Sequence, residues 1–310
     1  MTKSSGDGNE GRGLILVGYD GSASADAAVE WAVAEGIRTA TPVLLAYAFD
    51  WSGGAGPIVP GPAGWPNAEA RRDAEAMVRV AAAEAAEAHP PADVSAVLLD
   101  GPAAVRLRER SRGATLLVVG NRGHGGFADL LLGSTSVAVS AHAHCPVVVV
   151  RGDDADVGTT GGAGDATGTM PVVVGVDGSD ESLLALRFAV EQAASRGVPL
   201  RVLRAWSPPA QQWQLPPFDT REIAAAERAL VDDVLGPWRE KYPQVAMTAE
   251  AVGDSPGRVL VDASRTAGLV VVGSRGRGGF TGLLLGSVSQ QLLHHSHCPV
   301  AVIREFITHH

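Results

Sequence analysis

Two copies of one glycine-rich phrase contain the residues of this chain that could bind a charged ligand. GNRGHGGFADLLLGS occupies residues 120–134 and GSRGRGGFTGLLLGS occupies residues 273–287, and eleven of the fifteen positions are identical. Each phrase follows a short apolar run and ends in Gly-Ser at the expected start of a helix. Free backbone N–H groups and the helix dipole make such a helix start an anion site. The spacing G-x2-G-x9-G-S therefore predicts a phosphate-binding loop in each half of the chain.

Charged side chains accompany both phrases. Arg122 and Arg275 follow the apolar runs and are expected to reach phosphate oxygens. Asp20 and Asp177 stand in the sequence Asp-Gly-Ser after the first apolar run of each half. Their carboxylates suit the donors of adenine or ribose better than phosphates, so we expect them at the nucleoside end of a ligand. An Asx turn beside Ser22 is the structural alternative for Asp20.

The motifs of several other nucleotide chemistries are absent. A Walker-type loop needs a lysine after its second glycine, but the only lysines, Lys3 and Lys241, lie outside the glycine phrases. The H-x-G-H pair of adenylyl transferases and the S-G-G-x-D-S loop do not occur. No carboxylate for Mg²⁺ recurs in both phrases. A weak ATPase or phosphotransferase is therefore the alternative hypothesis, and slow ATP hydrolysis is the most it would do.

Histidine and cysteine cluster before the last apolar run of each half, as HAHCP at 142–146 and HSHCP at 295–299. Neither cluster has a second ligand pair at zinc-like spacing. Histidine suits a helix C-terminus and cysteine suits a core, so we expect structural roles and no metal. Two cysteines also exclude a disulfide scaffold and favour buried thiols in a reducing compartment.

Composition and charge exclude several classes of partner. The net charge of −9 argues against nucleic-acid binding, which depends on lysine and arginine. The polar N-terminus lacks the apolar centre of a signal peptide, and no run approaches the ~20 apolar residues of a membrane span. We therefore expect a cytoplasmic protein with no nucleic-acid or membrane partner.

The chain repeats itself along its whole length. LILVGYDGSASA at 14–25 returns as VVVGVDGSDESL at 172–183, and HAHCPVVVV at 142–150 returns as HSHCPVAVI at 295–303. Two domains are predicted, at 11–151 and 170–305. Residues 152–169 are rich in Gly, Thr and Asp without apolar periodicity, which predicts a flexible linker.

Each domain alternates apolar runs with helical patterns. Strands are expected at 14–18, 43–49, 94–99, 116–119 and 147–150, and long helices at 68–89 and 220–240, with Gly236-Pro237 breaking the end of the second. Such alternation predicts two tandem α/β domains, each a doubly wound, Rossmann-like, five-stranded parallel sheet of order 3-2-1-4-5. Ligands of such sheets bind between strands 1 and 4, where both repeated motifs lie.

VGYDGS, the glycine phrase and HCPVVVV, with their second copies, resemble the universal stress protein family. The resemblance covers nearly the whole chain and is to tandem two-domain members of the ATP-binding branch. It implies ATP, with or without Mg²⁺, as the ligand and a regulatory role in stress response through an unknown protein partner. It also implies pairing of the domains through their last strands, or of two chains as a homodimer. The implied nucleotide sites are Gly18, Asp20, Ala48, Gly120, Arg122, Gly123, Gly133, Ser134 and Thr135 in the first domain, and Gly175, Asp177, Ala205, Gly273, Arg275, Gly276, Gly286, Ser287 and Val288 in the second.

The two predicted sites differ in charge. His124 and Asp129 of the first phrase correspond to Arg277 and Gly282 of the second, which makes the second loop more positive. We therefore expect the second domain to bind ATP more tightly. Tyr19 also stands where the second domain has a valine. Tryptophans in Gly/Pro-rich loops after the second strands are expected to cover the nucleotide or a partner site: Trp51, Trp65 and Trp213.

Overall fold

The computed structural model describes residues 13–50, 67–123, 132–152, 170–206, 220–278 and 284–305. Most of the predicted linker lies outside these ranges. Other residues singled out above that lie outside them are Trp51, Trp65, His124, Asp129, Trp213 and Gly282.

The described elements form two lobes with the same order of strands and helices. Lobe one comprises β1 (Leu14–Gly18), α1 (Ala23–Thr39), β2 (Val43–Phe49), α2 (Asn67–Ala88), β3 (Val94–Asp100), α3 (Ala103–Arg110), β4 (Ala114–Gly120), α4 (Ser134–His142) and β5 (Val147–Val150). Lobe two comprises β6 (Val172–Gly175), α5 (Asp180–Arg196), β7 (Leu200–Ala205), α6 (Thr220–Lys241), β8 (Met247–Val252), α7 (Pro256–Ala263), β9 (Leu269–Gly273), α8 (Ser287–His295) and β10 (Val300–Ile303).

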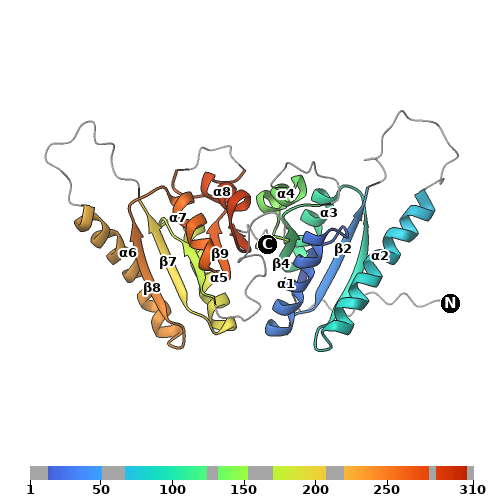
Figure 1. Cartoon of the computed structure of the whole chain (residues 1–310), viewed down its shortest axis with the longest axis horizontal. Coiled ribbons are helices and arrows are strands. Elements are labelled where there is room, and N and C mark those ends of the chain that lie inside the picture. The colour runs from blue at the N-terminus through green and yellow to red at the C-terminus, as the bar shows by residue number, and fades with distance from the viewer. Residues whose placement is uncertain are drawn as a thin grey trace.

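The strands of both lobes belong to one ten-stranded sheet of order β3-β2-β1-β4-β5-β10-β9-β6-β7-β8. Within each lobe the neighbouring strands are parallel and follow the predicted order 3-2-1-4-5. The antiparallel pairing of β5 with β10 joins the two five-stranded halves into this one sheet. Figure 1 shows the lobes side by side about this junction, with α2 and α6 at the two outer edges.

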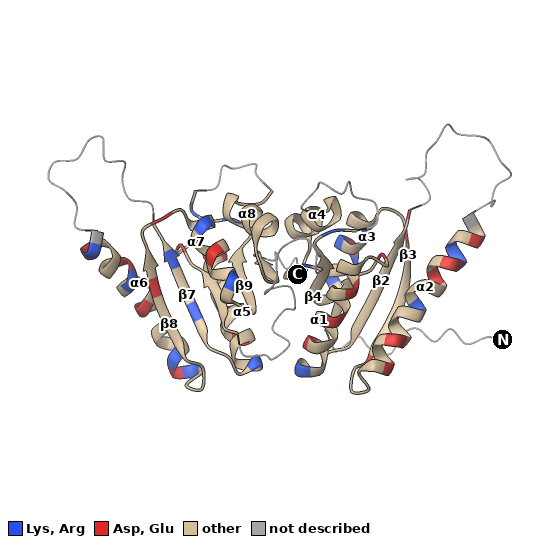
Figure 2. Ribbon diagram, viewed as in Figure 1, with Lys and Arg blue, Asp and Glu red and all other residues tan. Residues whose placement is uncertain are grey.

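Alternate side chains of each strand enter two apolar layers. Ile15 and Val17 of β1 pack with α1 and α2, whereas Leu16 between them packs with α3 and α4. Helices α5 and α6 in lobe two cover the same face as α1 and α2, and α7 and α8 cover the other face. Because both faces of the sheet are covered, the strands are near-continuous apolar runs. Charged residues instead gather along the outer helices α2 and α6 (Figure 2).

Helix α6 runs through Gly236 and Pro237 to Lys241, so the predicted break at these residues is wrong. A proline inside a helix removes one backbone hydrogen bond and crowds the preceding turn. The residues after Pro237 are held by packing, because Trp238 and Tyr242 lie against the core. Their rings stack with a distance of 6.2 Å between the ring centroids. Tertiary contacts therefore outweigh the local preference for a break.

The junction between the lobes is a short antiparallel strand pair, and two arginines add hydrogen bonds across it. Val149 pairs with Val300 and Val147 with Val302. Arg151, which follows β5, donates to the carbonyl of His294 at the end of α8. Arg304, which follows β10, donates to the carbonyl of Ala141 at the end of α4. Each lobe thus supplies a cation to the C-terminal end of a helix in the other lobe, where the helix dipole favours it. The predicted pairing through the last strands is confirmed.

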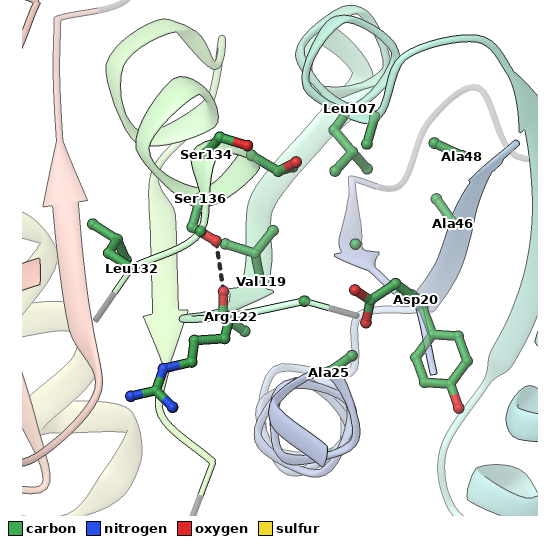
Figure 3. Close-up of a pocket in the computed structure, with 17 residues that line it drawn as sticks. Asp20, Ala25, Ala46, Ala48, Leu107, Val119, Arg122, Leu132, Ser134 and Ser136 are labelled. Carbon is green, nitrogen blue, oxygen red and sulfur yellow. Dashed lines mark hydrogen bonds between the residues drawn. The ribbon is translucent and has the colours of Figure 1, made fainter. Parts of the chain in front are cut away.

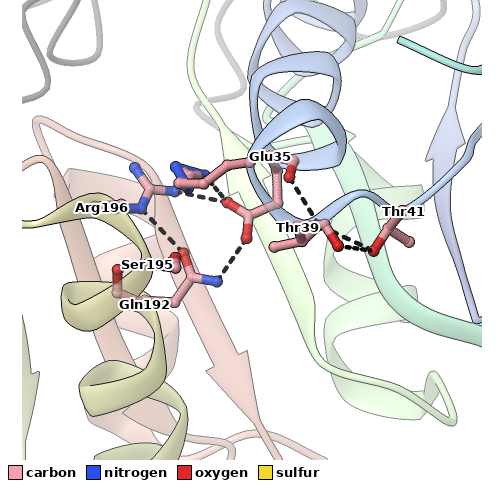
Figure 4. Close-up of polar contacts among 7 residues, drawn as sticks. Glu35, Thr39, Thr41, Gln192, Ser195 and Arg196 are labelled. Carbon is pink, nitrogen blue, oxygen red and sulfur yellow. Dashed lines mark hydrogen bonds and ion pairs between the residues drawn. The ribbon is translucent and has the colours of Figure 1, made fainter. Parts of the chain in front are cut away.

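A buried carboxylate joins α1 and α5 across the same junction (Figure 4). Glu35 of α1 is only 2 % exposed. Its Oε1 accepts a hydrogen bond from the amide of Gln192 at 2.8 Å, and its Oε2 accepts one from Arg196 at 3.1 Å. Arg38, one helical turn along α1, also pairs with it. Gln192 occupies the position in α5 that Glu35 occupies in α1. The carboxylate at this contact is therefore supplied by lobe one only.

Candidate functional site

A cavity of about 460 Å³ opens at the carboxyl ends of β1 and β4 in lobe one (Figure 3). This is the point where the strand order reverses and where ligands of doubly wound sheets bind. Its volume falls in the range of small-molecule sites. The lining includes all nine predicted residues of this lobe: Gly18, Asp20, Ala48, Gly120, Arg122, Gly123, Gly133, Ser134 and Thr135.

The cavity also has lining residues that sequence reasoning missed. Ala103 and Leu107 come from α3, one helical turn apart, and Ala46 and Val119 come from β2 and β4. They provide apolar lining in addition to the glycines. Small apolar residues on a helix resemble any core position in the sequence, so no motif marks them. The only signal in the sequence is their separation by four positions, which places Ala103 and Leu107 on the same face of a helix.

Asp20 and Asp177 begin the first helix of each lobe by forming Asx turns. Asp20 Oδ1 accepts hydrogen bonds from the backbone N–H and hydroxyl of Ser22, at 3.0 and 2.6 Å. Asp177 Oδ1 accepts the same pair from Ser179, at 2.9 and 2.6 Å. The turn that was the alternative for Asp20 is therefore present. It leaves Asp20 among the residues that line the cavity.

The second glycine of each loop contacts these aspartates. A Cβ on Gly123 would overlap Oδ2 of Asp20, and a Cβ on Gly276 would overlap Oδ2 of Asp177. The first glycine is also packed by protein, because a Cβ on Gly120 would lie 2.6 Å from the carbonyl oxygen of Ser24. These glycines were expected to let a ligand approach the backbone. In the structure, the absence of a side chain at these positions lets the loop pack against residues at the beginning of α1 or α5.

The third glycine differs, because it stands directly before a helix at the edge of the cavity. Gly133 is the N-cap residue of α4 and has no side chain with which to accept a hydrogen bond from the first turn. Its own N–H donates to the carbonyl of Asn121 at 2.7 Å, and the Ser136 hydroxyl donates to the carbonyl of Gly120 at 2.7 Å. Gly286 and Ser289 of lobe two make the matching contacts. The helix start is thus fixed beside the strand end with its backbone donors directed outward.

The two arginines that were predicted to bind phosphate extend toward different surroundings in the two lobes. The guanidinium group of Arg122 points away from Asp20 and Ser134 in Figure 3. The guanidinium group of Arg275 pairs with Glu181 on α5 at 2.9 Å.

The remaining predicted residues of lobe two occupy positions equivalent to those around the cavity. Gly175 ends β6 and Ala205 ends β7, as Gly18 and Ala48 lie at the ends of β1 and β2. Ser287 and Val288 form the first turn of α8. Their grouping in lobe two rests on this equivalence of position.

The histidine and cysteine clusters lie at the lobe junction side of α4 and α8. Burial raises the pKa of the Cys145 thiol to about 12, and burial also raises that of Cys298 to about 12. Both cysteines are therefore neutral thiols rather than metal-binding thiolates near pH 7. Burial also lowers the pKa of His142 and His144, with neighbouring arginines adding to the effect. In the part of the chain that the structure describes, no three His, Cys, Asp or Glu side chains are grouped to hold a metal ion.

The sequence pattern of the universal stress protein family matches residues 12–151 and 169–304. The chain belongs to this family. Universal stress protein Rv2623 of Mycobacterium tuberculosis is 36% identical over 307 residues, which cover 97% of this chain and 99% of that protein. Universal stress protein Rv2005c of the same organism is 37% identical over 295 residues, which cover 94% of this chain and 97% of that protein.

Solved structures of the family share the fold of this universal stress protein. The crystal structure of a universal stress protein from Archaeoglobus fulgidus superposes with a TM-score of 0.65 at 17% sequence identity, covering 95% of this chain and 97% of that chain. The tandem α/β architecture is therefore that of the family. Across the described ranges, none of the helices is both long and apolar enough to cross a membrane.

Proposed function

We propose that this universal stress protein binds ATP at the glycine loops and acts as a nucleotide-dependent regulatory module in the cytoplasm. In this proposal the nucleotide-binding domains are residues 11–151 and 170–305, joined by the linker 152–169. A protein partner, or a second copy of the chain, senses whether the nucleotide is bound.

The cavity of lobe one carries this proposal. It combines an apolar wall, a carboxylate at one side and the uncapped start of α4 at the other, within one space of about 460 Å³. A flat base fits against apolar side chains, and hydrogen-bond acceptors such as Asp20 suit its amino group or a ribose hydroxyl. The N–H groups of Ser134 and Thr135 and the helix dipole suit phosphate oxygens. The donor set therefore fits an adenine nucleotide from its base to its phosphates.

A magnesium ion bound with ATP would be held largely by the phosphates. The hydroxyls of Ser134 and Thr135, which line the cavity at the start of α4, would be side-chain oxygens available to it. When bound, such an ion neutralises phosphate charge. The protein's own contribution is to position the nucleotide, because no lysine lies in either glycine loop.

The first test is to denature the freshly purified protein and identify the released small molecules by mass spectrometry. Release of ATP in stoichiometric amounts is expected. Gly133→Val should abolish retention in lobe one, because its side chain fills space at the helix start that the phosphates need. Thermal unfolding of the same variant without nucleotide serves as the control for folding.

Two outcomes would contradict the proposal. Absence of any nucleotide, together with an unchanged melting temperature on adding ATP, would leave the cavity without its ligand. Release of ADP, with steady ADP production that disappears in the double variant Gly133→Val with Gly286→Val, would favour the ATPase alternative.

A further inference from the structure

The glycine loop of lobe two is bound by a glutamate of its own lobe. Glu181, in the first turn of α5, is largely buried, with 12% of its side chain exposed. Its Oε1 accepts hydrogen bonds from Nε and Nη2 of Arg275, at 3.1 and 2.9 Å. Its Oε2 accepts them from the backbone N–H of Arg275 at 2.5 Å and from the Ser274 hydroxyl at 2.7 Å. Both carboxylate oxygens are therefore saturated by groups of the loop.

Lobe one has no carboxylate at the equivalent position. Ser24 corresponds to Glu181, and its hydroxyl donates to the carbonyl of Arg122 at 2.5 Å. A neutral hydroxyl can neither pair with a guanidinium group nor repel a phosphate. At this position the loop is therefore contacted by a neutral hydroxyl in lobe one and by a carboxylate in lobe two.

Glu181 lies directly against the residues expected to meet the phosphates. A Cβ on Gly273 would lie 3.1 Å from the Cβ of Glu181. Gly120 and Arg122, which correspond to Gly273 and Arg275, both line the cavity of lobe one. A phosphate group in lobe two would thus compete with a fixed negative charge for the same N–H and guanidinium donors.

The other arginine of this loop is also engaged. The backbone N–H of Arg277 donates to Asp177 Oδ2 at 2.8 Å, and its guanidinium group donates to the carbonyl of Gly178 at 3.3 Å. The extra positive charge that predicted tighter binding in lobe two is therefore directed to the start of α5, while Glu181 neutralises Arg275.

We propose that Glu181 makes lobe two the weaker nucleotide site, so that the chain binds one ATP tightly, in lobe one. The inference rests on the proposed function and identifies a residue that sets which loop accepts phosphate. This proposal reverses the expectation that lobe two binds ATP more tightly. That expectation considered the charges of the loop residues but not the Glu181 carboxylate, which α5 places beside the loop. A phosphate in lobe two would have to displace the Glu181 carboxylate from Arg275.

The test exchanges the two equivalent residues in the full-length chain. ATP binding is measured by isothermal titration, and the lobe occupied is identified by photolabelling with 8-azido-ATP and peptide mapping. The unaltered chain should bind one ATP tightly and be labelled in lobe one. Glu181→Ser should strengthen binding in lobe two on the order of tenfold, the size expected for one charged hydrogen bond. Ser24→Glu should weaken lobe one, and the double exchange should move the label to lobe two.

Two further variants separate the effect of Glu181 from general charge and from folding. Asp180→Ser removes the same charge from the neighbouring, exposed position and should leave both sites unchanged. Glu181→Gln keeps the shape of the side chain without its charge and should give a smaller gain in the ATP affinity of lobe two. It replaces Glu181→Ser as the test if that variant does not fold. Equal labelling of both lobes in the unaltered chain, or no gain with Glu181→Ser and Glu181→Gln, would overturn this inference while leaving ATP binding intact. Failure of every variant to bind ATP would overturn the proposed function as well.

Discussion

At the scale of single residues, the site depends on two aspartates that organise the protein before any ligand arrives. Asp177 is half-buried, and burial alone would raise the pKa of its carboxyl. Hydrogen bonds from the hydroxyl and N–H of Ser179 and from the N–H of Arg277 outweigh burial, so the pKa of Asp177 is lowered from its ordinary value of 3.8. The ionised carboxylate thus ties the start of α5 to the glycine loop.

This lowered pKa predicts a pH-dependent contribution of Asp177 to stability. A carboxyl whose pKa is lower in the folded state stabilises the protein fully above its unfolded-state pKa, and the effect disappears as pH falls through the folded-state value. We expect Asp177→Asn to lower the melting temperature at pH 7. The difference between the two proteins should narrow below about pH 4. Thermal unfolding from pH 7 to pH 3 measures it, and a difference that stays constant across this range would contradict the assignment.

At the scale of elements, the first helices of the two lobes end in the same geometry with different residues. Ala40 follows α1 with φ 51° and ψ 40°, and Gly197 follows α5 with φ 66° and ψ 31°. Both N–H groups donate back to the last turn of their helix. Left-handed backbone costs an alanine more than a glycine, because the Cβ approaches the following carbonyl. Ala40 is the only non-glycine residue of the described ranges with positive φ.

Ala40→Gly is therefore expected to stabilise the protein, and Gly197→Ala to destabilise it. Each substitution should change the free energy of unfolding by about 0.5–1 kcal/mol. This is the cost of a left-handed alanine, reduced by the greater conformational freedom of glycine in the unfolded chain. A Cβ on Gly197 would meet nothing within 4 Å, so the backbone conformation alone decides the result. Chemical denaturation gives both free energies of unfolding. Changes of the same sign in the two variants would refute this explanation.

At the scale of the whole molecule, the two lobes recognise each other through a contact that is not symmetric. The antiparallel pairing of β5 with β10 relates the lobes as near-equivalents, and the same relation places Glu35 opposite Gln192. Two facing glutamates would bring like charges together away from water, which is costly. With glutamate on one helix and glutamine on the other, lobe one suits lobe two better than it suits a second lobe one.

Gln192→Glu should therefore weaken the junction by about 3 kcal/mol, the cost of a poorly compensated buried charge. The double variant Glu35→Gln with Gln192→Glu should recover most of the loss, because the carboxylate then lies beside Arg196 on α5, whose Nε already donates to position 192 at 3.0 Å. Thermal unfolding measures both variants. Equal destabilisation of the single and double variants would show that shape, rather than charge placement, governs this contact.

The sequence by itself determined the repeated order of strands and helices and the location of the loops. Apolar runs, helix starts and glycine spacing are local properties, and the strand boundaries of β1, β2 and β5 agree with their predicted ranges. The nine residues predicted for lobe one surround one cavity for the same reason, since parallel strands place their carboxyl ends at a common edge.

Only the tertiary structure decided which groups meet those loops. Glu181 and Arg275 are separated by 94 positions, and Glu35 and Gln192 by 157. The unbroken α6 likewise depends on what Trp238 and Tyr242 pack against. Such contacts follow from the packing of helices on a completed sheet, and no local pattern encodes them. The motifs therefore mark the loops at which we propose that a nucleotide binds, whereas the charge at each loop depends on the side chains that the fold brings beside it.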